Sequence, residues 1–473
     1  MTSKPSPLWE SHLAQLKSFY NSPETDTHWA SRHYVELLAH YYRLVIPASA
    51  SILEIGCGSG ELLALLPNRK VTGLDLSESF ISKARQRLPH GRFEVCAAEL
   101  FESPEKFDFI IISGTINFLA DIQFLLERLQ KFSHSETRLV VNFYNTLWRP
   151  VIETARFLGL KRADPPSNWL SKDDVINLLD LSDWQLIQKQ TRILVPAPLL
   201  GLEALPNRFL SPFLQAFCLS IFCVARLRPG TGAGDYSVSV VIPARNEAGN
   251  IEAAVLRTPA MGRLTEIIFV EGHSTDNTWD EIQRVAKKYP DRQIKILQQS
   301  GAGKGNAVRE GFAAASGDIL MILDADLTMP PEELPKFYDV LASRHAEFAN
   351  GVRLVYPMEK EAMRFLNMCA NKFFSIAFTW LLGQPVKDTL CGTKVLFRKD
   401  YESIVANRSY FGNFDPFGDF DLLFGASKLN LKIADVPIRY RNRTYGSTNI
   451  HRWKHGLLLL RMTMFAARKL KFI

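Results

Sequence analysis

Two acidic residues separated by an alanine, Asp324-Ala325-Asp326, follow the apolar run 319–323. An uninterrupted apolar run of this length is typical of a buried strand, so both carboxylates are expected where that strand ends. Burying ionised carboxylates without partners costs free energy, whereas a divalent cation takes oxygen ligands and bridges them to phosphates. The pair therefore indicates a metal site for a nucleotide diphosphate. The alternative is that the two side chains cap the next helix or face water.

Three other predicted strands in the same half of the chain also end in polar or glycine-rich loops. In an open parallel sheet, ligands bind beyond the carboxyl ends of the strands. Four such loops in succession predict one shared nucleotide-binding site more specifically than any single loop. The four loops are 243–247, 271–278, 301–307 and 324–326.

Lys304 lies in a glycine-rich loop that differs from a phosphate-binding P-loop. The loop lacks the first glycine of the P-loop pattern, and Gly305 stands where a serine or threonine would hold Mg²⁺. We expect Lys304 to neutralise a donor phosphate or to cap the following helix. The alternative is a solvated loop lysine.

A different glycine-rich turn lies in the N-terminal half of the chain. Gly56, Gly58 and Gly60 follow the predicted strand 52–55 and lead into a predicted helix. Glycine allows the backbone to turn tightly and to approach a ligand closely. Asp75 ends the next strand about 20 residues on, where a carboxylate can bind ribose hydroxyls. The G-x-G-x-G spacing differs from that of dinucleotide sites and favours a nucleoside ligand without a pyrophosphate.

The elements that must position these residues occur in two successive series. The 473 residues, 47% hydrophobic and 22% charged, indicate a globular chain of two or three domains. Strands alternate with amphipathic stretches from residue 51 to 141, and again after the Gly-rich segment 228–235. This alternation predicts parallel sheets covered on both faces. We therefore predict two doubly wound α/β domains in tandem.

The domain boundaries follow from the same pattern. The first domain is expected to cover 1–227, with a core at about 49–145 and an extension at 146–227. The segment that follows is rich in glycine and poor in apolar residues, which is typical of a linker. We place the linker at 228–237 and the second domain at 238–473.

Composition narrows the compartment and the partners. The six cysteines form no C-x-x-C pair, so a reducing compartment is expected rather than a zinc site or a disulfide framework. The net charge of +7 permits contact with phosphates or an anionic membrane but does not require nucleic acid. No signal-peptide pattern is visible, and no apolar run reaches the ~18 residues of a transmembrane helix. We expect a cytoplasmic protein that binds no nucleic acid.

The glycine turn and Asp75 resemble the class I S-adenosylmethionine-dependent methyltransferases, over roughly residues 30–145. The resemblance implies a Rossmann-like methyltransferase fold that binds S-adenosyl-L-methionine, with Asp75 at the ribose and Glu99 near the adenine. Many members have Gly-Asp where this chain has Cys96-Ala97, so the adenine contacts depart from the family pattern. A domain that binds the cofactor poorly, or serves only as a scaffold, is the alternative. The residues implied at the amino-acid end of the cofactor are Glu54, Gly56, Gly58 and Gly60.

The four loops of the C-terminal half occur in the same order as in the family 2 (A-type) glycosyltransferases. They resemble most the polyprenyl- and dolichyl-phosphate sugar synthases, over about residues 236–450. The resemblance implies an A-type glycosyltransferase fold in which Asp324 and Asp326 flank the diphosphate of a nucleotide sugar and its Mg²⁺ or Mn²⁺. The usual Asp-Asp after the second strand is Glu271-Gly272 here, so uridine and guanosine both stay open. The residues implied around the nucleoside are Pro243, Arg245, Glu247 and Glu271, with Lys304 and Asp324 at the phosphates.

The same resemblance assigns an acceptor side. Arg353 lies in a stretch that lines it and is a catalytic candidate, and Arg443 and Thr448 would contact an acceptor phosphate. We therefore expect sugar transfer to a polyprenyl phosphate, fused to methyl transfer. The alternative is transfer to a hydroxyl of a growing glycan by a chain whose methyltransferase domain is inactive or a scaffold. That reaction needs a general base, for which Asp419 is the first candidate and Asp421 the second, unless both cap a helix.

Two segments are expected to contact a membrane. Residues 367–382 are strongly apolar, and residues 453–473 mix apolar and basic side chains with a tryptophan. This composition is typical of helices that lie in the headgroup plane of an anionic leaflet. We expect peripheral association with the inner face of the cell membrane. The alternative is that both helices pack on the glycosyltransferase core or on a partner subunit.

Overall fold

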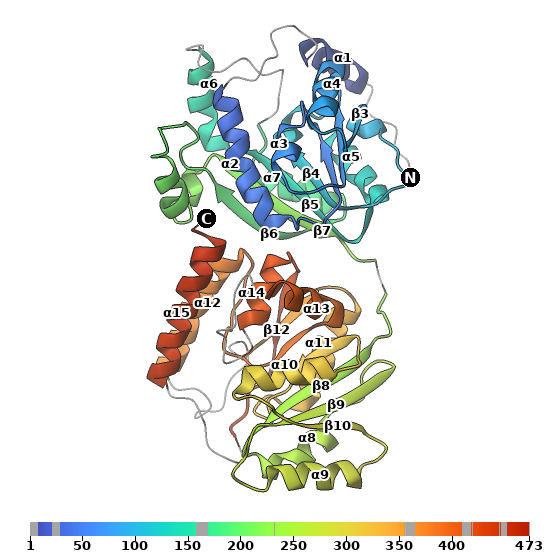
Figure 1. Ribbon diagram of the computed structural model, residues 1–473, viewed down its shortest axis with the longest axis vertical. Coiled ribbons are helices and arrows are strands. Elements are labelled where there is room, and N and C mark those ends of the chain that lie inside the picture. Colours follow the sequence, from blue (N-terminus) through green and yellow to red (C-terminus); the bar gives the residue numbers. More distant parts are fainter. Residues whose placement is uncertain are drawn as a thin grey trace. The chain divides into compact units, whose positions relative to one another are not determined.

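The computed structural model describes residues 8–20, 29–157, 169–230, 232–353, 355, 365–408, 418, 420–443, 445 and 452–472. The chain forms two compact units, and each is described by itself (Figure 1). The first unit comprises Met1–Arg228 and Phe472, and the second comprises Pro229–Lys471 and Ile473. Each unit contains one seven-stranded sheet.

The sheet of the first unit has the strand order 3-2-1-4-5-7-6. β7 runs antiparallel to β5 and β6, and the other neighbouring strands are parallel. The strands are β1 (Ile52–Ile55), β2 (Val71–Asp75), β3 (Arg92–Val95), β4 (Phe107–Ser113), β5 (Ser133–Tyr144), β6 (Trp184–Arg192) and β7 (Ser220–Leu227). The helices are α1 (Leu8–Tyr20), α2 (Trp29–Val45), α3 (Glu61–Leu65), α4 (Glu78–Arg87), α5 (Ile122–Leu129), α6 (Arg149–Phe157) and α7 (Lys172–Leu181).

Side chains alternate between the two faces of this sheet because successive strand residues point in opposite directions. Ile52 of β1 packs in a cluster with α2, α3 and α4, whereas Leu53 packs with α5 and α7 on the opposite face. Helices therefore cover both faces, and the prediction of a doubly wound domain is confirmed. The expectation of a parallel sheet is wrong for β7, which is antiparallel to β5 and β6. The strands β6 and β7 both come from the predicted extension 146–227 and complete this edge of the sheet.

The sheet of the second unit has the strand order 10-9-8-11-13-12-14, in which β13 is antiparallel to β11 and β12. This one reversal makes the sheet mixed rather than purely parallel, as in the first unit. The strands are β8 (Ser237–Ala244), β9 (Leu264–Glu271), β10 (Gln293–Gln298), β11 (Ile319–Ile322), β12 (Phe348–Val352), β13 (Lys394–Phe397) and β14 (Ile433–Pro437). The helices are α8 (Ile251–Arg257), α9 (Thr278–Lys288), α10 (Lys304–Ala314), α11 (Leu334–Ala342), α12 (Phe365–Leu382), α13 (Arg398–Ala406), α14 (Phe420–Lys428) and α15 (Arg452–Leu470).

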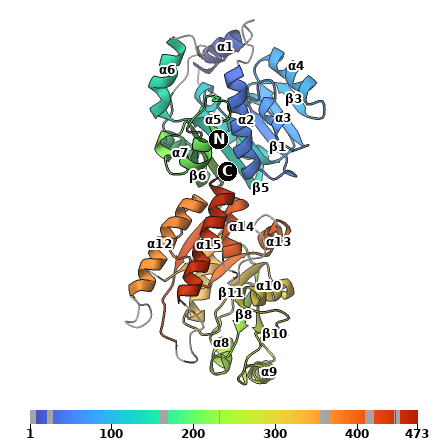
Figure 2. The ribbon, with the colours of Figure 1, turned by 60° about the vertical axis from the view of Figure 1, so that its left-hand side comes forward.

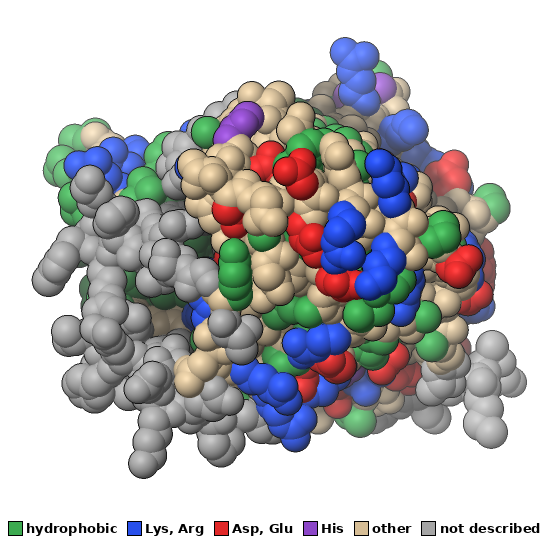
Figure 3. Space-filling model, turned by 90° about the horizontal axis from the view of Figure 1, so that it is seen from below, with side chains coloured by type: hydrophobic (Ala, Val, Ile, Leu, Met, Phe, Trp, Pro, Cys, Tyr) green, Lys and Arg blue, Asp and Glu red, His purple; other side chains and the backbone are tan. Residues whose placement is uncertain are grey.

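The two helices expected at a membrane lie together in the second unit. α12 packs along α15 in both ribbon views (Figures 1 and 2). None of the described helices combines the length and the apolar character that a membrane crossing requires. The face that carries α8 and α9 is highly charged, with basic and acidic side chains interspersed (Figure 3).

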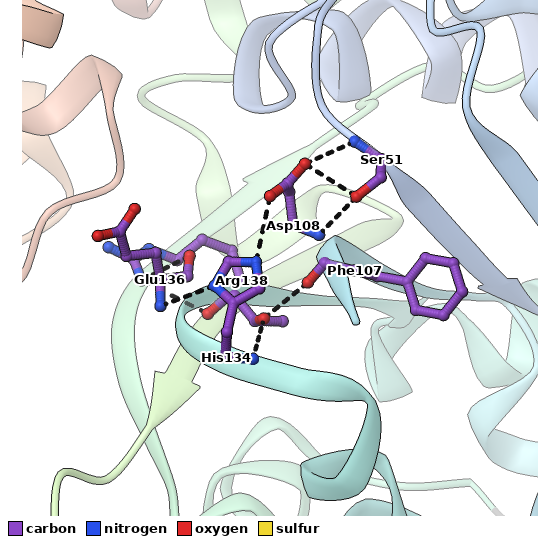
Figure 4. A network of polar contacts seen from close by, with 7 residues as sticks. Ser51, Phe107, Asp108, His134, Glu136 and Arg138 are labelled. Carbon is purple, nitrogen blue, oxygen red and sulfur yellow. Dashed lines mark hydrogen bonds and ion pairs between the residues drawn. The ribbon is translucent and has the colours of Figure 1, made fainter. Parts of the chain in front are cut away.

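A serine–aspartate pair joins the two central strands at the amino end of each sheet. Asp108 Oδ2 accepts hydrogen bonds from Ser51 N and Oγ, both at 2.8 Å, and His134 Nε2 lies 3.1 Å from Asp108 Oδ1 (Figure 4). In the second unit Asp318 Oδ2 accepts from Ser237 N at 2.9 Å and from Ser237 Oγ at 2.7 Å. Both pairs lie at the edge opposite the strand-end loops, so they fix the strands without occupying either candidate site.

Candidate functional sites

The glycine turn of the first unit lies where the strand order reverses, between β1 and β4. Gly56, Gly58 and Gly60 have φ angles of 71°, 52° and 72°, in the left-handed region where a Cβ atom is disfavoured. A Cβ at Gly58 would have nothing within 4 Å, so the turn is open to a ligand there. The glycines are therefore required by the backbone path, and the turn leaves room for a molecule above it.

Asp75 shapes this turn. Its Oδ2 accepts a hydrogen bond from Gly58 N at 2.8 Å, and its Oδ1 accepts one from Ser77 N at 2.9 Å. Burial raises the pKa of Asp75, while the hydrogen bonds from Ser77 and Gly58 act in the opposite direction. Each oxygen keeps a further lone pair, so Asp75 can hold the turn and accept a ribose hydroxyl at once.

Glu54 is the penultimate residue of β1, close enough to Asp75 for the two charges to interact, and it is only 3% exposed. Its Oε2 has no hydrogen-bond partner among the described residues, which is unusual for a buried polar atom. Burial, and next the charge of Asp75, raise the pKa of Glu54 well above its ordinary value. A ligand ammonium group would supply both the missing donor and the missing charge, so this carboxylate fits the amino-acid end of S-adenosylmethionine.

Glu99 lies in the short helical turn Ala98–Leu100 that follows β3. Because β3 neighbours β2, Glu99 stands at the same edge of the sheet as Asp75, and it is buried. The structure thus brings all six predicted cofactor residues to the carboxyl ends of β1, β2 and β3.

Asp324 and Asp326 follow β11 and each has a cationic partner. Asp324 Oδ1 lies 2.6 Å from Lys304 Nζ, at the first residue of α10. Asp326 Oδ2 lies 2.7 Å from Arg443, while its Oδ1 accepts from Thr328 N and Oγ1. Burial would raise the pKa of Asp324, but the charge and hydrogen bond of Lys304 outweigh it and lower that pKa. Both carboxylates thus lie at the end of β11 beside cationic side chains, Asp324 beside Lys304 and Asp326 beside Arg443.

Asp324 and Asp326 have the chemistry of ligands for a divalent cation. Among the described residues no three His, Cys, Asp or Glu side chains converge on one point. Mg²⁺ is commonly held by one or two carboxylates together with substrate phosphates and water. Asp324 and Asp326 supply that number of carboxylates, with Lys304 beside them for the phosphate charge. The residues fit a cation that arrives with a diphosphate.

Arg443 connects this acidic pair to the nucleoside loop. Its Nη1 lies 3.0 Å from Glu247 Oε1 and its Nη2 lies 2.7 Å from Asp326 Oδ2. Asn250 donates to the other oxygen of Glu247 at 2.7 Å. Burial raises the pKa of Glu247, whereas the charge of Arg443 acts against this rise. Thr448, predicted to bind phosphate with Arg443, lies outside the described residues.

The remaining nucleoside candidates surround the ends of β8 and β9. Pro243 belongs to β8, Arg245 follows it and is exposed, and Glu271 ends β9 and is buried. Ser274 N donates to Glu271 Oε1 at 2.6 Å, so this carboxylate stabilises its own loop. A Cβ at Gly272 would lie 3.4 Å from the Cβ of Arg245. The two loops are therefore neighbours, as the shared site requires.

Arg353 is held by a buried carboxylate. Its Nε and Nη2 lie 2.7 Å and 2.9 Å from the two oxygens of Asp388, which also accept from Asn371. Burial opposes ionisation, but the charge and hydrogen bonds of Arg353 lower the pKa of Asp388 to about 2. A bidentate buried pair of this kind fixes the guanidinium, so Arg353 can act on a ligand only through its remaining N–H groups.

Asp421 lies on α14, is mostly buried and faces two arginines. Its Oδ2 is 3.2 Å from Arg408 Nε and 3.5 Å from Arg309 Nη2. Asp419 lies outside the described residues. Gly418 is described, and a Cβ there would come closer than 3.0 Å to the Cα of Gly305 at the start of α10. The segment before α14 therefore passes beside the residue that follows Lys304.

Two residues of this site were missed by sequence reasoning. A Cβ at Gly392 would come closer than 3.0 Å to both Asp324 Oδ2 and Lys304 Nζ, so this glycine makes room for their ion pair. Lys394 on β13 is fully buried and donates to Cys391 O. Burial raises the pKa of Asp324, Lys304 lowers it, and the charge of Lys394 lowers it further. A strand lysine read from sequence is ordinarily exposed, so no signal marked it.

Two family models match the chain. Residues 239–404 match the model described as glycosyl transferase family 2. Residues 53–139 match the model described as a methyltransferase domain. The first match includes Asp324 and Asp326, and the second includes the glycine turn and Asp75.

Relatives of known name match parts of the chain. Dolichol-phosphate mannosyltransferase of Pyrococcus furiosus is 38% identical over 220 residues, which is 45% of this chain and 59% of that protein. Undecaprenyl-phosphate 4-deoxy-4-formamido-L-arabinose transferase of Yersinia pestis is 34% identical over 146 residues, which is 28% of this chain and 43% of that protein. The chain thus spans about half the length of these relatives. A solved SAM-dependent methyltransferase of Thermotoga maritima, a possible histamine N-methyltransferase, is 17% identical, with a TM-score of 0.33 over 46% of this chain and 99% of that chain.

The predicted fusion is confirmed by these matches. The N-terminal unit carries a methyltransferase domain and the C-terminal unit carries a glycosyl transferase family 2 domain. The roles expected of the chain's individual site residues stay predictions.

Proposed function

We propose that this chain, which joins a methyltransferase domain to a glycosyl transferase family 2 domain, transfers a sugar from a nucleotide-sugar donor to a polyprenyl phosphate. The observation that carries the proposal is the pair Asp324 and Asp326 at the carboxyl edge of the sheet, with Lys304 beside Asp324 and Arg443 beside Asp326. The names of the relatives, a dolichol-phosphate and an undecaprenyl-phosphate sugar transferase, support the acceptor class.

The donor is expected to bind along the four strand-end loops. Glu247, Glu271 and Arg245 surround the nucleoside, and Lys304 neutralises part of the diphosphate charge. A divalent cation held by Asp324 and Asp326 supplies the positive charge that stabilises the departing nucleoside diphosphate. Arg443 contacts Asp326 and Glu247 without a ligand, so a bound donor and cation would release this guanidinium toward the acceptor phosphate.

The state of Asp421 supports a phosphate acceptor. A general base must reach the proton that it removes, but the Asp421 carboxylate is buried between Arg408 and Arg309. A phosphate acceptor is already an anion and needs no base. Arg353 and Arg443 provide positive charge instead, and Arg353 is held in place by Asp388. These contacts count against Asp421 as a general base and provide cations for a phosphate acceptor.

The first unit is expected to bind S-adenosylmethionine and to transfer its methyl group. The partnerless carboxylate oxygen of Glu54 suits the ammonium group of the ligand, and Asp75 suits its ribose. The methyl acceptor is a molecule related to the lipid-linked product. We place the chain at the inner face of the cell membrane, where α12 and α15 would lie against the headgroups.

Metal-dependent turnover tests this function. Purified protein is incubated with labelled nucleotide sugars, polyprenyl phosphate and Mg²⁺ or Mn²⁺, with EDTA as the comparison. Asp324→Ala and Asp326→Ala should each abolish transfer, and Asp339→Ala, which removes an exposed carboxylate of α11, should leave it unchanged. Asp419→Asn should leave turnover nearly unchanged, because a phosphate acceptor needs no general base. Transfer that survives both Asp324→Ala and Asp326→Ala would refute the assignment, and loss of transfer in a folded Asp419→Asn enzyme would favour a hydroxyl acceptor.

A further inference from the structure

The segment 199–217 of the first unit has the reverse of the usual distribution of side chains. Its polar residues Glu203, Asn207 and Ser211 are buried. Nine of its large apolar residues are exposed, and Leu200 is fully exposed at 102%. Two of them, Phe209 and Phe213, also contact the ring of Phe472. In a soluble domain an exposed apolar side chain is ordinary when it is isolated, but a contiguous group marks an interaction surface. The exposed members are Leu199, Leu200, Leu202, Leu205, Phe209, Leu210, Phe213, Leu214 and Phe217.

The buried polar side chains satisfy the backbone of this segment from within. Asn207 Oδ1 accepts from Leu194 N and Val195 N, both at 2.8 Å, and its Nδ2 donates to Val195 O. Glu203 Oε2 accepts from Leu199 N at 2.8 Å and Gly201 N at 3.0 Å. In hydrocarbon each backbone polar group must find its partner inside the protein. This arrangement suits entry into lipid, because the backbone N–H groups that Asn207 and Glu203 accept from need no hydrogen bond with water.

The charges around the segment suit an anionic surface. Glu203 and Arg208 are the only ionisable residues between 196 and 217, and Glu203 is buried. Arg208 is exposed and its Nε donates to Phe472 O at 3.2 Å. Arg43 of α2 is exposed and acts electrostatically on His40, as Arg208 does. The segment therefore presents apolar side chains with Arg208 as its exposed cation. The face with α8 and α9, where both signs of charge mix, lacks this combination (Figure 3).

A tryptophan contacts one end of the segment. Trp148 Nε1 donates to Phe217 O at 2.7 Å, which joins the segment to the turn before α6. Asn145 donates to Ala216 O and Cys218 O and fixes the same end. Tryptophan is enriched at the boundary between lipid and water because its ring is apolar and its N–H is polar.

We propose that the segment 199–217 inserts its leucine and phenylalanine side chains into an anionic lipid surface and so attaches the methyltransferase domain to the membrane. The segment 199–217 belongs to the first unit, whereas α12 and α15 belong to the second. The inference does not depend on the identity of the sugar acceptor. It gives the N-terminal domain its own membrane contact.

Vesicle binding by the full chain tests the proposal. Vesicles of phosphatidylcholine alone are compared with vesicles that also contain phosphatidylserine, and bound protein is measured by flotation. The double substitution Leu200→Ser with Leu202→Ser should lower the partition coefficient about 100-fold or more, since two leucine side chains no longer enter the lipid. Leu256→Ser, an exposed leucine of α8, is the matched control and should bind as the unchanged chain does. Arg208→Gln should reduce the preference for phosphatidylserine.

A second variant reports on insertion directly. Leu200→Trp should show a blue-shifted emission on vesicles and quenching by spin labels in the acyl chains. Equal vesicle binding by the double serine variant and the unchanged chain would overturn the proposal. So would an unshifted emission of Leu200→Trp on vesicles. A dimer that dissociates in the double serine variant, or a crosslink from residue 200 to the second unit, would assign the surface to protein and also overturn it.

Discussion

Gly392 offers a way to disturb the acidic pair of the glycosyltransferase domain without removing any charge. An alanine Cβ at this position would come closer than 3.0 Å to Asp324 Oδ2 and Lys304 Nζ, whereas ordinary van der Waals contact begins at 3.4 Å. The carboxylate must therefore move by about 1 Å, and a misplacement of this size at a reacting site can cost about 100-fold in rate. This loss corresponds to ~2.7 kcal/mol of barrier.

The same substitution should have a smaller effect on folding. The displaced atoms are the end of a flexible lysine and a carboxylate that can rotate, so we expect a loss of unfolding free energy near the low end of the ~1–3 kcal/mol range for overpacking. The assay is sugar transfer from a labelled donor with Mg²⁺ or Mn²⁺, together with a thermal melt. Gly230→Ala is the control, because a Cβ there would have nothing within 4 Å. A folded Gly392→Ala enzyme with an unchanged rate would refute the placement of the donor at Asp324.

Three further perturbations test separate contacts. Glu54→Gln should raise the melting temperature of the ligand-free protein at pH 7 and weaken S-adenosylmethionine binding by calorimetry. The reason is that burial raises the pKa of Glu54, so the stability contributed by its protonated carboxyl is complete only below the unfolded pKa of about 4.3 and is lost as the pH rises through the folded pKa. A lowered melting temperature would contradict this. Asp388→Asn should cost ~3–5 kcal/mol in denaturant unfolding by leaving Arg353 buried without its partner, and much less when Arg353→Met is already present. Asp108→Ala should cost ~1–3 kcal/mol by leaving Ser51 N unpaired, with S-adenosylmethionine affinity unchanged. Because the pKa of Asp108 is lowered despite burial, this difference from the unchanged chain should vanish as the pH falls below about 4.

The strands that sequence reasoning found include those built from continuous apolar runs. β1, β4, β8 and β11 lie at the centre of their sheets, where both faces are covered and nearly every position is apolar. β6 carries polar residues between its buried ones, and β12 contains Asn350 and Gly351, so neither pattern predicts a strand. The start of β7 could not be predicted for another reason. Its apolar run follows directly on an apolar segment, so no polar residues mark where the strand begins.

The site residues likewise include some that the sequence could place and others that it could not. Residues that end a predicted strand, such as Asp75 and Asp324, could be placed at the ligand edge because parallel strands end together. The contact of Arg443 with Glu247, 196 residues away in sequence, could not be placed, because it depends on the path of a loop after the last strand. The partnerless oxygen of Glu54 likewise emerges only when all its neighbours are in position.

The most direct test of the central claim is the destination of the sugar. Purified chain is supplied with labelled nucleotide sugars, polyprenyl phosphate and Mg²⁺ or Mn²⁺, and the products are separated into organic and aqueous phases. We expect label in the organic phase, in an alkali- or acid-labile lipid phosphate. This labelled product should be absent in the double variant Asp324→Ala with Asp326→Ala. Label that enters only aqueous glycans, or an organic-phase product that persists in the double variant, would contradict the claim.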